Sequence, residues 1–328
     1  MTQETLELKE NTELKNFWIK LRIRLRGTNQ TQGWVGKFIS YALLISIGFV
    51  YLYPLLHMLA TSFMSLDDLL DSSVTWIPSS LYLRNYQQVF QVMNLKEGLF
   101  GSIMISLVPT LFQLVVTCLV GYGFATYEFK FKKTMMFLLL FSFVIPPQIT
   151  MMPTYVLYND LGLLGSLKAF VIPALLGQGI KSPIFIFIFY QFFKQTPKSL
   201  YEAARVDGAG EWRIFYKVAL PMAMPAVVIV FLFSFVWYWN ETYLVNLYIG
   251  SVAGRSVKWT TVLIQLQLFR ASYEQLYPVA LHINTPNKWN EGVSMAGTVI
   301  SILPLLITYF VLQRYFVESV DNSGITGE

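Results

Sequence analysis

The chain has 328 residues, of which 55% are hydrophobic and only 13% charged, with a mean hydropathy of +0.50 and a formal net charge of +5. Soluble domains average roughly 45–50% apolar and about 25% charged residues, so this composition excludes an ordinary soluble protein. Apolar runs longer than about 18 residues recur, and each can cross a bilayer. We therefore predict an all-α integral membrane protein.

The first 34 residues form a charged tail. They lack an apolar core followed by a small-residue cleavage site, so we expect the first span to be an uncleaved anchor and not a signal peptide. Within the tail, residues 17–26 alternate between apolar and basic side chains. This stretch is either a helix lying on anionic membrane lipid or a simple topology determinant, and its period of two favours the second interpretation.

Six apolar stretches are predicted to be membrane spans within a transmembrane domain at 35–317. They cover residues 36–60, 99–125, 134–157, 169–193, 219–245 and 293–316. The remaining residues, 318–328, form a C-terminal tail.

An even number of spans places both termini on the same side of the membrane. With this topology, sixteen of the 24 lysines and arginines lie on the side of the termini and eight on the other. Positively charged loops stay in the cytoplasm. We therefore predict cytoplasmic termini, a cytoplasmic segment at 197–221 and an outer loop at 247–291.

The outer half of the third span contains Pro146, Pro147 and Pro153. Prolines inside a helix remove hydrogen bonds and clash with the preceding turn, so an unbroken helix is not expected here. Gln148 and Thr150 would then face a polar path through the membrane. The alternative is a kink that neighbouring helices repair.

The fourth span contains one charge, Lys181, in the run from Gly177 to Pro183. Charges inside spans are rare and usually face a cavity or a partner. The glycines and the proline around it predict a broken helix, which is tolerated only where it lines protein or water. Two interpretations stay open: Lys181 faces the transport path, or it reaches the outer surface.

The polar segment between spans four and five is rich in helix signals. Ser199 and Glu202 have the spacing of a capping box, which predicts a helix beginning at Leu200. Asp207 and Gly208 then end this helix, because glycine readily adopts the left-handed conformation of a helix exit.

The same segment is predicted to offer a docking surface. Ala203 and Ala204 leave the helix nearly bare, so that another protein can approach closely. Leu220 and Pro221 mark the start of the fifth membrane helix, since proline fits the first turn of a helix.

These residues match a known loop. Glu202-Ala203-Ala204 is followed after three residues by Gly208, and after nine more by Val218-x-Leu220-Pro221, with Phe215 between them. Further matching motifs occur in order along 35–317: Asn85-Tyr86, Gly121-Tyr122-Gly123-Phe124-Ala125, Pro146-Pro147-Gln148, Trp239-Asn240-Glu241 and Gln313-Arg314-Tyr315-Phe316. The chain thus resembles the permease subunits of carbohydrate ABC importers, specifically the smaller, six-span partner of the maltose-type pair.

The resemblance implies a type I ABC importer permease fold in the plasma membrane of a prokaryote. In this family the 197–221 segment is the coupling helix, which sits in a cleft of the ATPase and transmits its closure. The coupling residues implied are Glu202, Ala203, Ala204, Asp207, Gly208, Phe215, Leu220 and Pro221. No cofactor is expected in this chain, because ATP and Mg²⁺ would be bound by a partner ATPase dimer. The other expected partners are a second homologous permease and an extracytoplasmic solute-binding protein.

Candidates on the outer side follow from the same resemblance. Trp237 to Glu241 lie near the outer end of the fifth span, where aromatic residues usually form the interfacial belt. Sugar stacking and contact with the binding protein are the alternatives. The candidate path residues are Gln148, Thr150, Lys181, Trp239, Asn240 and Glu241. The outer loop either contacts the binding protein, through Tyr273, Tyr277 and Asn284, or is an exposed insertion.

Two other functions fit the sequence less well. A secondary transporter would show inverted repeats and intramembrane carboxylates, and the spans contain essentially none apart from Glu241. An intramembrane enzyme would need clustered nucleophiles or metal ligands, whereas the chain has two histidines and a single cysteine, Cys118. No phosphate-binding Gly-x-x-x-x-Gly-Lys-Ser/Thr motif occurs. We predict no enzymatic activity, no catalytic or metal site and no nucleic-acid partner, and we expect an oligosaccharide as the cargo.

Overall fold

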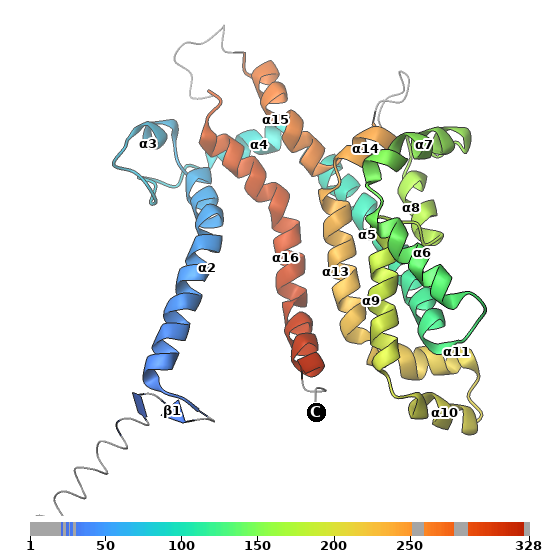
Figure 1. Cartoon of the computed structure of the whole chain (residues 1–328). Coiled ribbons are helices and arrows are strands. Elements are labelled where there is room, and N and C mark those ends of the chain that lie inside the picture. Colours follow the sequence, from blue (N-terminus) through green and yellow to red (C-terminus); the bar gives the residue numbers. More distant parts are fainter. Residues whose placement is uncertain are drawn as a thin grey trace, which may run out of the picture. The chain divides into compact units, whose positions relative to one another are not determined.

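The computed structural model in Figure 1 describes residues 21, 24, 25, 27 and 28, and then 31–250, 259–278 and 288–324. The chain divides into two compact units, Met1–Leu81 and Tyr82–Glu328. The first unit contains a minimal antiparallel pair and two helices. These are β1 (Gly27–Thr28), β2 (Thr31–Gln32), α2 (Trp34–Ser62) and α3 (Leu66–Leu70).

Helix α2 covers the first predicted span and is long and apolar enough to cross a membrane. None of its apolar window is buried within the described chain. Its exposed large side chains include Phe38 and Tyr51. An apolar helix without a soluble core against it is expected to meet lipid or another membrane helix.

Among the described residues of the second unit, the regular elements are all helices. Its elements are α4 (Arg84–Val92), α5 (Leu95–Thr126), α6 (Lys132–Val144), α7 (Pro147–Asp160), α8 (Lys168–Leu175), α9 (Ser182–Gln195), α10 (Lys198–Val206), α11 (Glu211–Ile214), a π-helical turn (Phe215–Ala219), α12 (Leu220–Met222), α13 (Met224–Asn240), α14 (Tyr243–Tyr248), α15 (Val262–Leu276) and α16 (Glu291–Gly324). The all-α prediction is confirmed apart from the two-residue strands of the first unit.

Three described helices, α2, α5 and α16, are long and apolar enough to cross a membrane alone. Two bent pairs meet the same criteria: α6 with α7, bent by 98°, and the Glu211–Met222 stretch with α13, bent by 76°. Together with the α8–α9 stretch, these elements are consistent with the six predicted spans.

Three predicted spans differ from straight helices. The third is interrupted between Val144 and Pro147, where the prolines stop α6 and restart the chain as α7. The fourth is interrupted by the 176–181 break between α8 and α9. The fifth begins at Met224 and not near 219, because the chain bends at Ala223, and it ends at Asn240 instead of 245.

The outer loop and the last span also differ from prediction. The 247–291 stretch is not a plain loop, since it contains α15, a helix of 15 residues that Thr261 caps through its side chain. Helix α16 continues beyond the predicted end at 316 as far as Gly324.

Helix α5 lies at the centre of the second unit and packs against α8, α9, α13 and α15. Gly121 allows the close approach of α5 and α9, because a Cβ there would lie 2.5 Å from Cβ of Phe189 on α9. Cys118, also on α5, is buried in this core. The small residues at this contact therefore set the spacing of the two helices.

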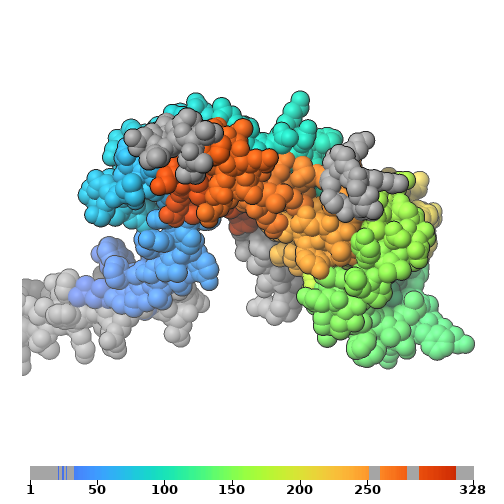
Figure 2. Space-filling view, turned by 90° about the horizontal axis from the view of Figure 1, so that it is seen from above, coloured from blue at the N-terminus to red at the C-terminus, as the bar shows by residue number. Residues whose placement is uncertain are grey.

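The end of the second unit away from α10 and α11 is built from α4, α15 and the start of α16, which contact one another. Figure 2 shows this end from above, with α15 and α16 in orange and red beside the cyan of α4. Their shared core contains Val89, Phe269, Tyr273 and Val293. The membrane-spanning helices of this unit and the cap formed by α4, α15 and the start of α16 thus belong to one unit.

Candidate functional site

The 197–221 segment folds as a short helix, a tight exit and a bent helical stretch. Helix α10 begins at Lys198, directly after Pro197 with φ −58°. The predicted capping box is wrong, since Pro197 occupies the capping position and no side chain caps the helix. The proline ring pre-sets an extended entry two residues earlier than the predicted cap at Ser199. Glu202 is therefore left as an exposed side chain of α10.

The exit from α10 confirms the role predicted for Gly208. Its φ is +77°, in the left-handed region that favours glycine. The Gly208 N–H donates to the Arg205 carbonyl at 3.0 Å and the Ala209 N–H to the Ala204 carbonyl at 2.9 Å. This pair of bonds is a Schellman motif, which satisfies the last carbonyls of the helix.

The two alanines of the motif lie on different faces. Ala203 is exposed, as predicted, whereas Ala204 is partly buried and packs on the core of its own chain. Successive helical residues are about 100° apart, so the two side chains cannot share one outward face. The surface available to a partner is the Glu202–Ala203 side of α10.

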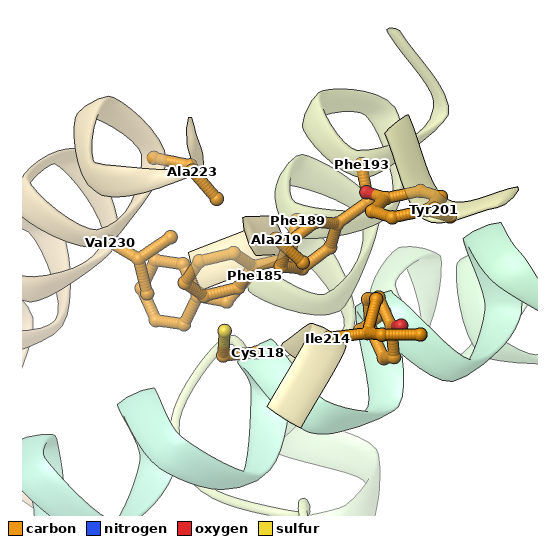
Figure 3. Packing of buried hydrophobic residues seen from close by; sticks show 11 residues of the cluster. Cys118, Phe185, Phe189, Phe193, Tyr201, Ile214, Ala219, Ala223 and Val230 are labelled. Carbon is orange, nitrogen blue, oxygen red and sulfur yellow. The ribbon is translucent and has the colours of Figure 1, made fainter. Parts of the chain in front are cut away.

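The inner face of α10 anchors it to the membrane helices. Tyr201 is buried, and Figure 3 shows it beside Phe193 of α9 and Ile214 of α11. The Tyr122 ring on α5 lies 5.3 Å from the ring of Phe193 and 5.0 Å from that of Phe215. Aromatic pairs at these distances pack favourably beyond their buried area. A displacement of α10 therefore acts on α5 and α9 through a packed core.

A polar brace, which the sequence reasoning missed, joins three parts of this region. Arg205 Nε donates to Glu211 Oε1 at 2.9 Å, and the Tyr127 hydroxyl donates to Glu211 Oε2 at 2.7 Å. The hydrogen bond from Arg205 holds the pKa of Glu211 below its ordinary value. The brace ties α10 to α11 and to the end of α5. The sequence signal for it was the pair of opposite charges on either side of the Gly208 turn.

Phe215, Leu220 and Pro221 continue the segment. Phe215 opens the π-helical turn and is half-buried in the aromatic cluster. Leu220 is partly buried and Pro221 is exposed in the first turn of α12. Proline at the start of α12 confirms the helix start predicted there, although the straight span begins only after the bend at Ala223.

The candidate path residues of the third span lie on α7. Gln148 and Thr150 are both exposed, and the Thr150 hydroxyl donates to the Pro147 carbonyl at 3.0 Å. No residue of α6 or α7 is buried. The structure therefore does not show the alternative interpretation, in which neighbouring helices of this chain pack closely against the kink.

Lys181 lies at the break predicted for the fourth span. It precedes α9 with φ +58°, one of two non-glycine residues with positive φ among those described. Its ammonium nitrogen lies 5.2 Å from the centre of the Phe143 ring at the end of α6. A cation at this distance interacts favourably with the ring face.

Buried side chains hold this break in place. Gln113 Nε2 donates to the Ile180 carbonyl at 2.7 Å and to Ser182 Oγ at 3.0 Å. The Tyr238 hydroxyl accepts from the Ile180 N–H at 3.2 Å, and Ser234 Oγ donates to Gln113 Oε1 at 3.4 Å. Unpaired backbone groups are costly inside a membrane, so this network is what makes the break tolerable.

The end of the fifth span corrects one candidate. Trp239 is 2% exposed and packs in the core, so it neither forms an interfacial belt nor faces the path. Asn240 is exposed and bonds its own helix through the Val236 carbonyl. Glu241 Oε1 accepts from the Leu244 N–H at 2.8 Å, which makes it a cap of α14.

The outer-loop candidates have different positions. Tyr273 is 1% exposed, so its side chain belongs to the outer core instead of a contact surface. Tyr277 is half-buried, and its hydroxyl donates to Gln91 Oε1 at 2.6 Å. Asn284 lies outside the described residues. Within the described part of the chain, no group of histidine, cysteine or acidic residues is arranged to hold a metal ion.

Curated relatives cover most of this chain. The arabinooligosaccharides transport system permease protein of Halalkalibacterium halodurans is 30% identical over 285 residues, which is 86% of this chain and 93% of that protein. The polygalacturonan/rhamnogalacturonan transport system permease protein of Bacillus subtilis is 25% identical over 88% of this chain and 96% of its own length. The diacetylchitobiose uptake system permease protein of Streptomyces coelicolor is 28% identical over 87% of each.

A solved structure shares the fold. One chain of a bacterial ABC transporter involved in the import of the acidic polysaccharide alginate has a TM-score of 0.65 and 22% identity, covering 86% of this chain and 96% of its own. Residues 116–322 match the family described as the binding-protein-dependent transport system inner membrane component. The chain therefore belongs to this family: it is a membrane permease of an ABC importer, which works with a separate ATPase and a solute-binding protein.

Proposed function

We propose that this chain forms half of the translocation pathway of an ATP-driven oligosaccharide importer and couples to the ATPase through the 197–221 segment. The observation that carries the coupling role is α10 itself. Its inner face is packed into the core of α5, α9 and α11, while Glu202 and Ala203 are exposed on its other side. A helix anchored in this way passes the motion of a docked partner to the spans.

The coupling partner in this proposal is an ATPase dimer, which binds ATP and Mg²⁺ in place of this chain. Glu202 pairs with a basic group of the ATPase, and Ala203 allows close approach. Gly208 and Asp207 set the exit of the helix, while Ala204, Phe215 and Leu220 transmit force inward and Pro221 starts the next helix.

The rest of the assembly follows the same proposal. A second homologous permease forms the other half of the pathway in the plasma membrane of a prokaryote, with lipid around both chains and both termini in the cytoplasm. An extracytoplasmic binding protein delivers the cargo near the outer cap, where Tyr277 and the loop containing Asn284 contact it. Gln148, Thr150 and Lys181 line the path, with Asn240 and Glu241 near its outer end.

The cargo is proposed from the relatives. Those reported above are described as permeases for arabinooligosaccharides, for polygalacturonan or rhamnogalacturonan, and for diacetylchitobiose. These substrates differ in sugar type but share glycosidic linkage, which supports an oligosaccharide as the substrate class.

The test is purification of the assembled complex through this chain. We expect an ATPase and a second permease to co-purify, and the ATPase activity to rise when the binding protein is added together with a member of an oligosaccharide panel. A complex without an ATPase would refute the coupling role. Stimulation by amino acids or metal ions in place of any glycan would refute the cargo.

A further inference from the structure

Lys181 lies at the break between α8 and α9, in the middle of the predicted fourth span. We propose that its ammonium group binds a negatively charged group of the cargo, so that the importer carries an acidic oligosaccharide bearing carboxylates. This inference rests on the proposed function and names the substrate class of the same path.

The depth of Lys181 in the membrane is the first argument. It directly precedes α9, whose other end at Gln195 leads into the 197–221 segment. Fourteen helical residues rise roughly 21 Å at 1.5 Å each, within a hydrocarbon core about 30 Å thick. Lys181 therefore lies well inside the membrane. A charge at this depth faces a watery cavity, a ligand or an opposite charge.

The surroundings of the ammonium group are the second argument. The ion pairs among the described residues are Lys132–Glu128, Arg205–Glu211 and Arg270–Glu274, and none involves Lys181. Glu241, the intramembrane carboxylate noted in the sequence, is bonded to the Leu244 N–H. The contact that Lys181 does make is with the Phe143 ring, which is itself 38% exposed. The cation thus has an aromatic neighbour and no carboxylate neighbour within the described chain.

The rigidity of its backbone is the third argument. Lys181 adopts φ +58°, a conformation that costs free energy for any residue with a Cβ. Its two neighbours, Ile180 and Ser182, are both hydrogen-bonded by Gln113 from α5. A Cβ on Gly179 would lie 2.6 Å from the Tyr238 hydroxyl, so this position requires glycine. The backbone on both sides of Lys181 is therefore held in place, as a preorganised binding group requires.

The chemistry of the group names the ligand class. An ammonium presents three donors and no acceptor, so it selects an anion over a neutral hydroxyl. A carboxylate on a sugar ring provides the ammonium group with a charge-assisted partner. A neutral oligosaccharide would leave the intramembrane charge unpaired. The site therefore favours an acidic cargo.

The first experiment uses the complete complex with its binding protein in proteoliposomes. ATPase stimulation and uptake are measured with galacturonate, glucuronate and mannuronate oligomers and with neutral galactose, glucose and mannose oligomers of matched length. We expect the acidic set to stimulate. If only the neutral set stimulates, the oligosaccharide function stands and the present inference is overturned. If neither set stimulates, the proposed cargo class fails as well.

The second experiment compares three variants with an acidic oligomer. Lys181→Gln should lower uptake about tenfold to a hundredfold, since losing a charge-assisted bond changes an equilibrium by that factor. Lys181→Arg should restore most of the uptake. Lys168→Gln, an exposed lysine at the start of α8 in the same broken span, is the control and should transport like the wild type.

Two results would overturn the proposal. One is unchanged uptake of the acidic oligomer by Lys181→Gln. The other is loss of the second permease from purified Lys181→Gln complexes, with Lys181→Arg retaining it, because Lys181 would then pair with a carboxylate of the partner chain instead of the cargo.

Discussion

The chain changes direction at the 176–181 break and again at Gly208, and different kinds of hydrogen bond hold the two turns. At Gly208 the turn is made by backbone bonds between residues three to five positions apart. At the break, the chain is held by Gln113 and Tyr238, which are 67 and 58 positions away from Ile180. The turn at Gly208 is local and exposed, while the break is long-range and buried. A turn held by local bonds can lie on a surface that another protein contacts. A break inside a membrane needs hydrogen bonds from distant residues, because every polar group there must be hydrogen-bonded.

The largest effect is expected at the exposed face beside the local turn. Glu202→Lys should leave the complex assembled but lower uptake by more than tenfold, because removing one member of a buried interface charge pair costs about 2–5 kcal/mol. Uptake and ATPase activity are measured in proteoliposomes. Glu128→Lys is the control, an exposed acidic residue between α5 and α6 that should tolerate the same charge change. Wild-type uptake by the Glu202 variant would show that Glu202 does not couple the chain to the ATPase.

The second prediction targets the local turn itself. Gly208→Ala should weaken the α10 exit by about 1–2 kcal/mol, because the left-handed conformation is strained for any residue with a Cβ. Gly210→Ala is the matched control, since Gly210 has φ −70° and open space around its Cβ position. Uptake at increasing temperature compares the two. If uptake by both variants falls at the same temperature, the turn does not need the left-handed conformation of Gly208.

The third prediction targets the long-range break. Gln113→Leu should destabilise the complex by about 1–3 kcal/mol, because it leaves the Ile180 carbonyl and Ser182 Oγ without their buried donor. Thr117→Val is the control on the same helix, since the Thr117 hydroxyl bonds only carbonyls of α5 itself. Thermal unfolding of the purified complex measures both. A control as damaging as the Gln113 variant would mean that the network does not hold the break.

The smallest effect is expected at the exposed brace. Glu211→Gln should cost at most about 1 kcal/mol, since exposed ion pairs contribute little. The pKa of Glu211 is lowered from its ordinary 4.5, so its contribution is present above pH 4.5 and is lost as the pH falls through the lower, folded-state pKa. The difference in thermal stability from the wild type should therefore shrink in acid. A difference that stays the same as the pH falls would show that the ionised Glu211 carboxylate does not stabilise the brace.

The sequence predicted much of what depends on neighbouring residues, although the capping box at Ser199 and Glu202 was wrong and helix α15 was missed. The apolar runs identified the membrane helices, since a bilayer demands length and apolarity from each span separately. Gly208 was predicted correctly because its conformation is a property of the glycine itself. The prolines after Val144 predicted the interruption between α6 and α7 for the same reason.

Tertiary structure decided what depends on residues far apart in the chain. Trp239 and Tyr273 were expected at exposed outer positions, yet both are buried, because a helix end shows its aromatic content but not which neighbours cover it. The polar brace at Glu211 and the hydrogen-bond network at Gln113 depend on partners from other helices. The sequence by itself determined a helical membrane permease with a local turn at Gly208. Only packing around α5 decided which polar groups are paired, and left Lys181 at the 176–181 break without an ion-pair partner among the described residues.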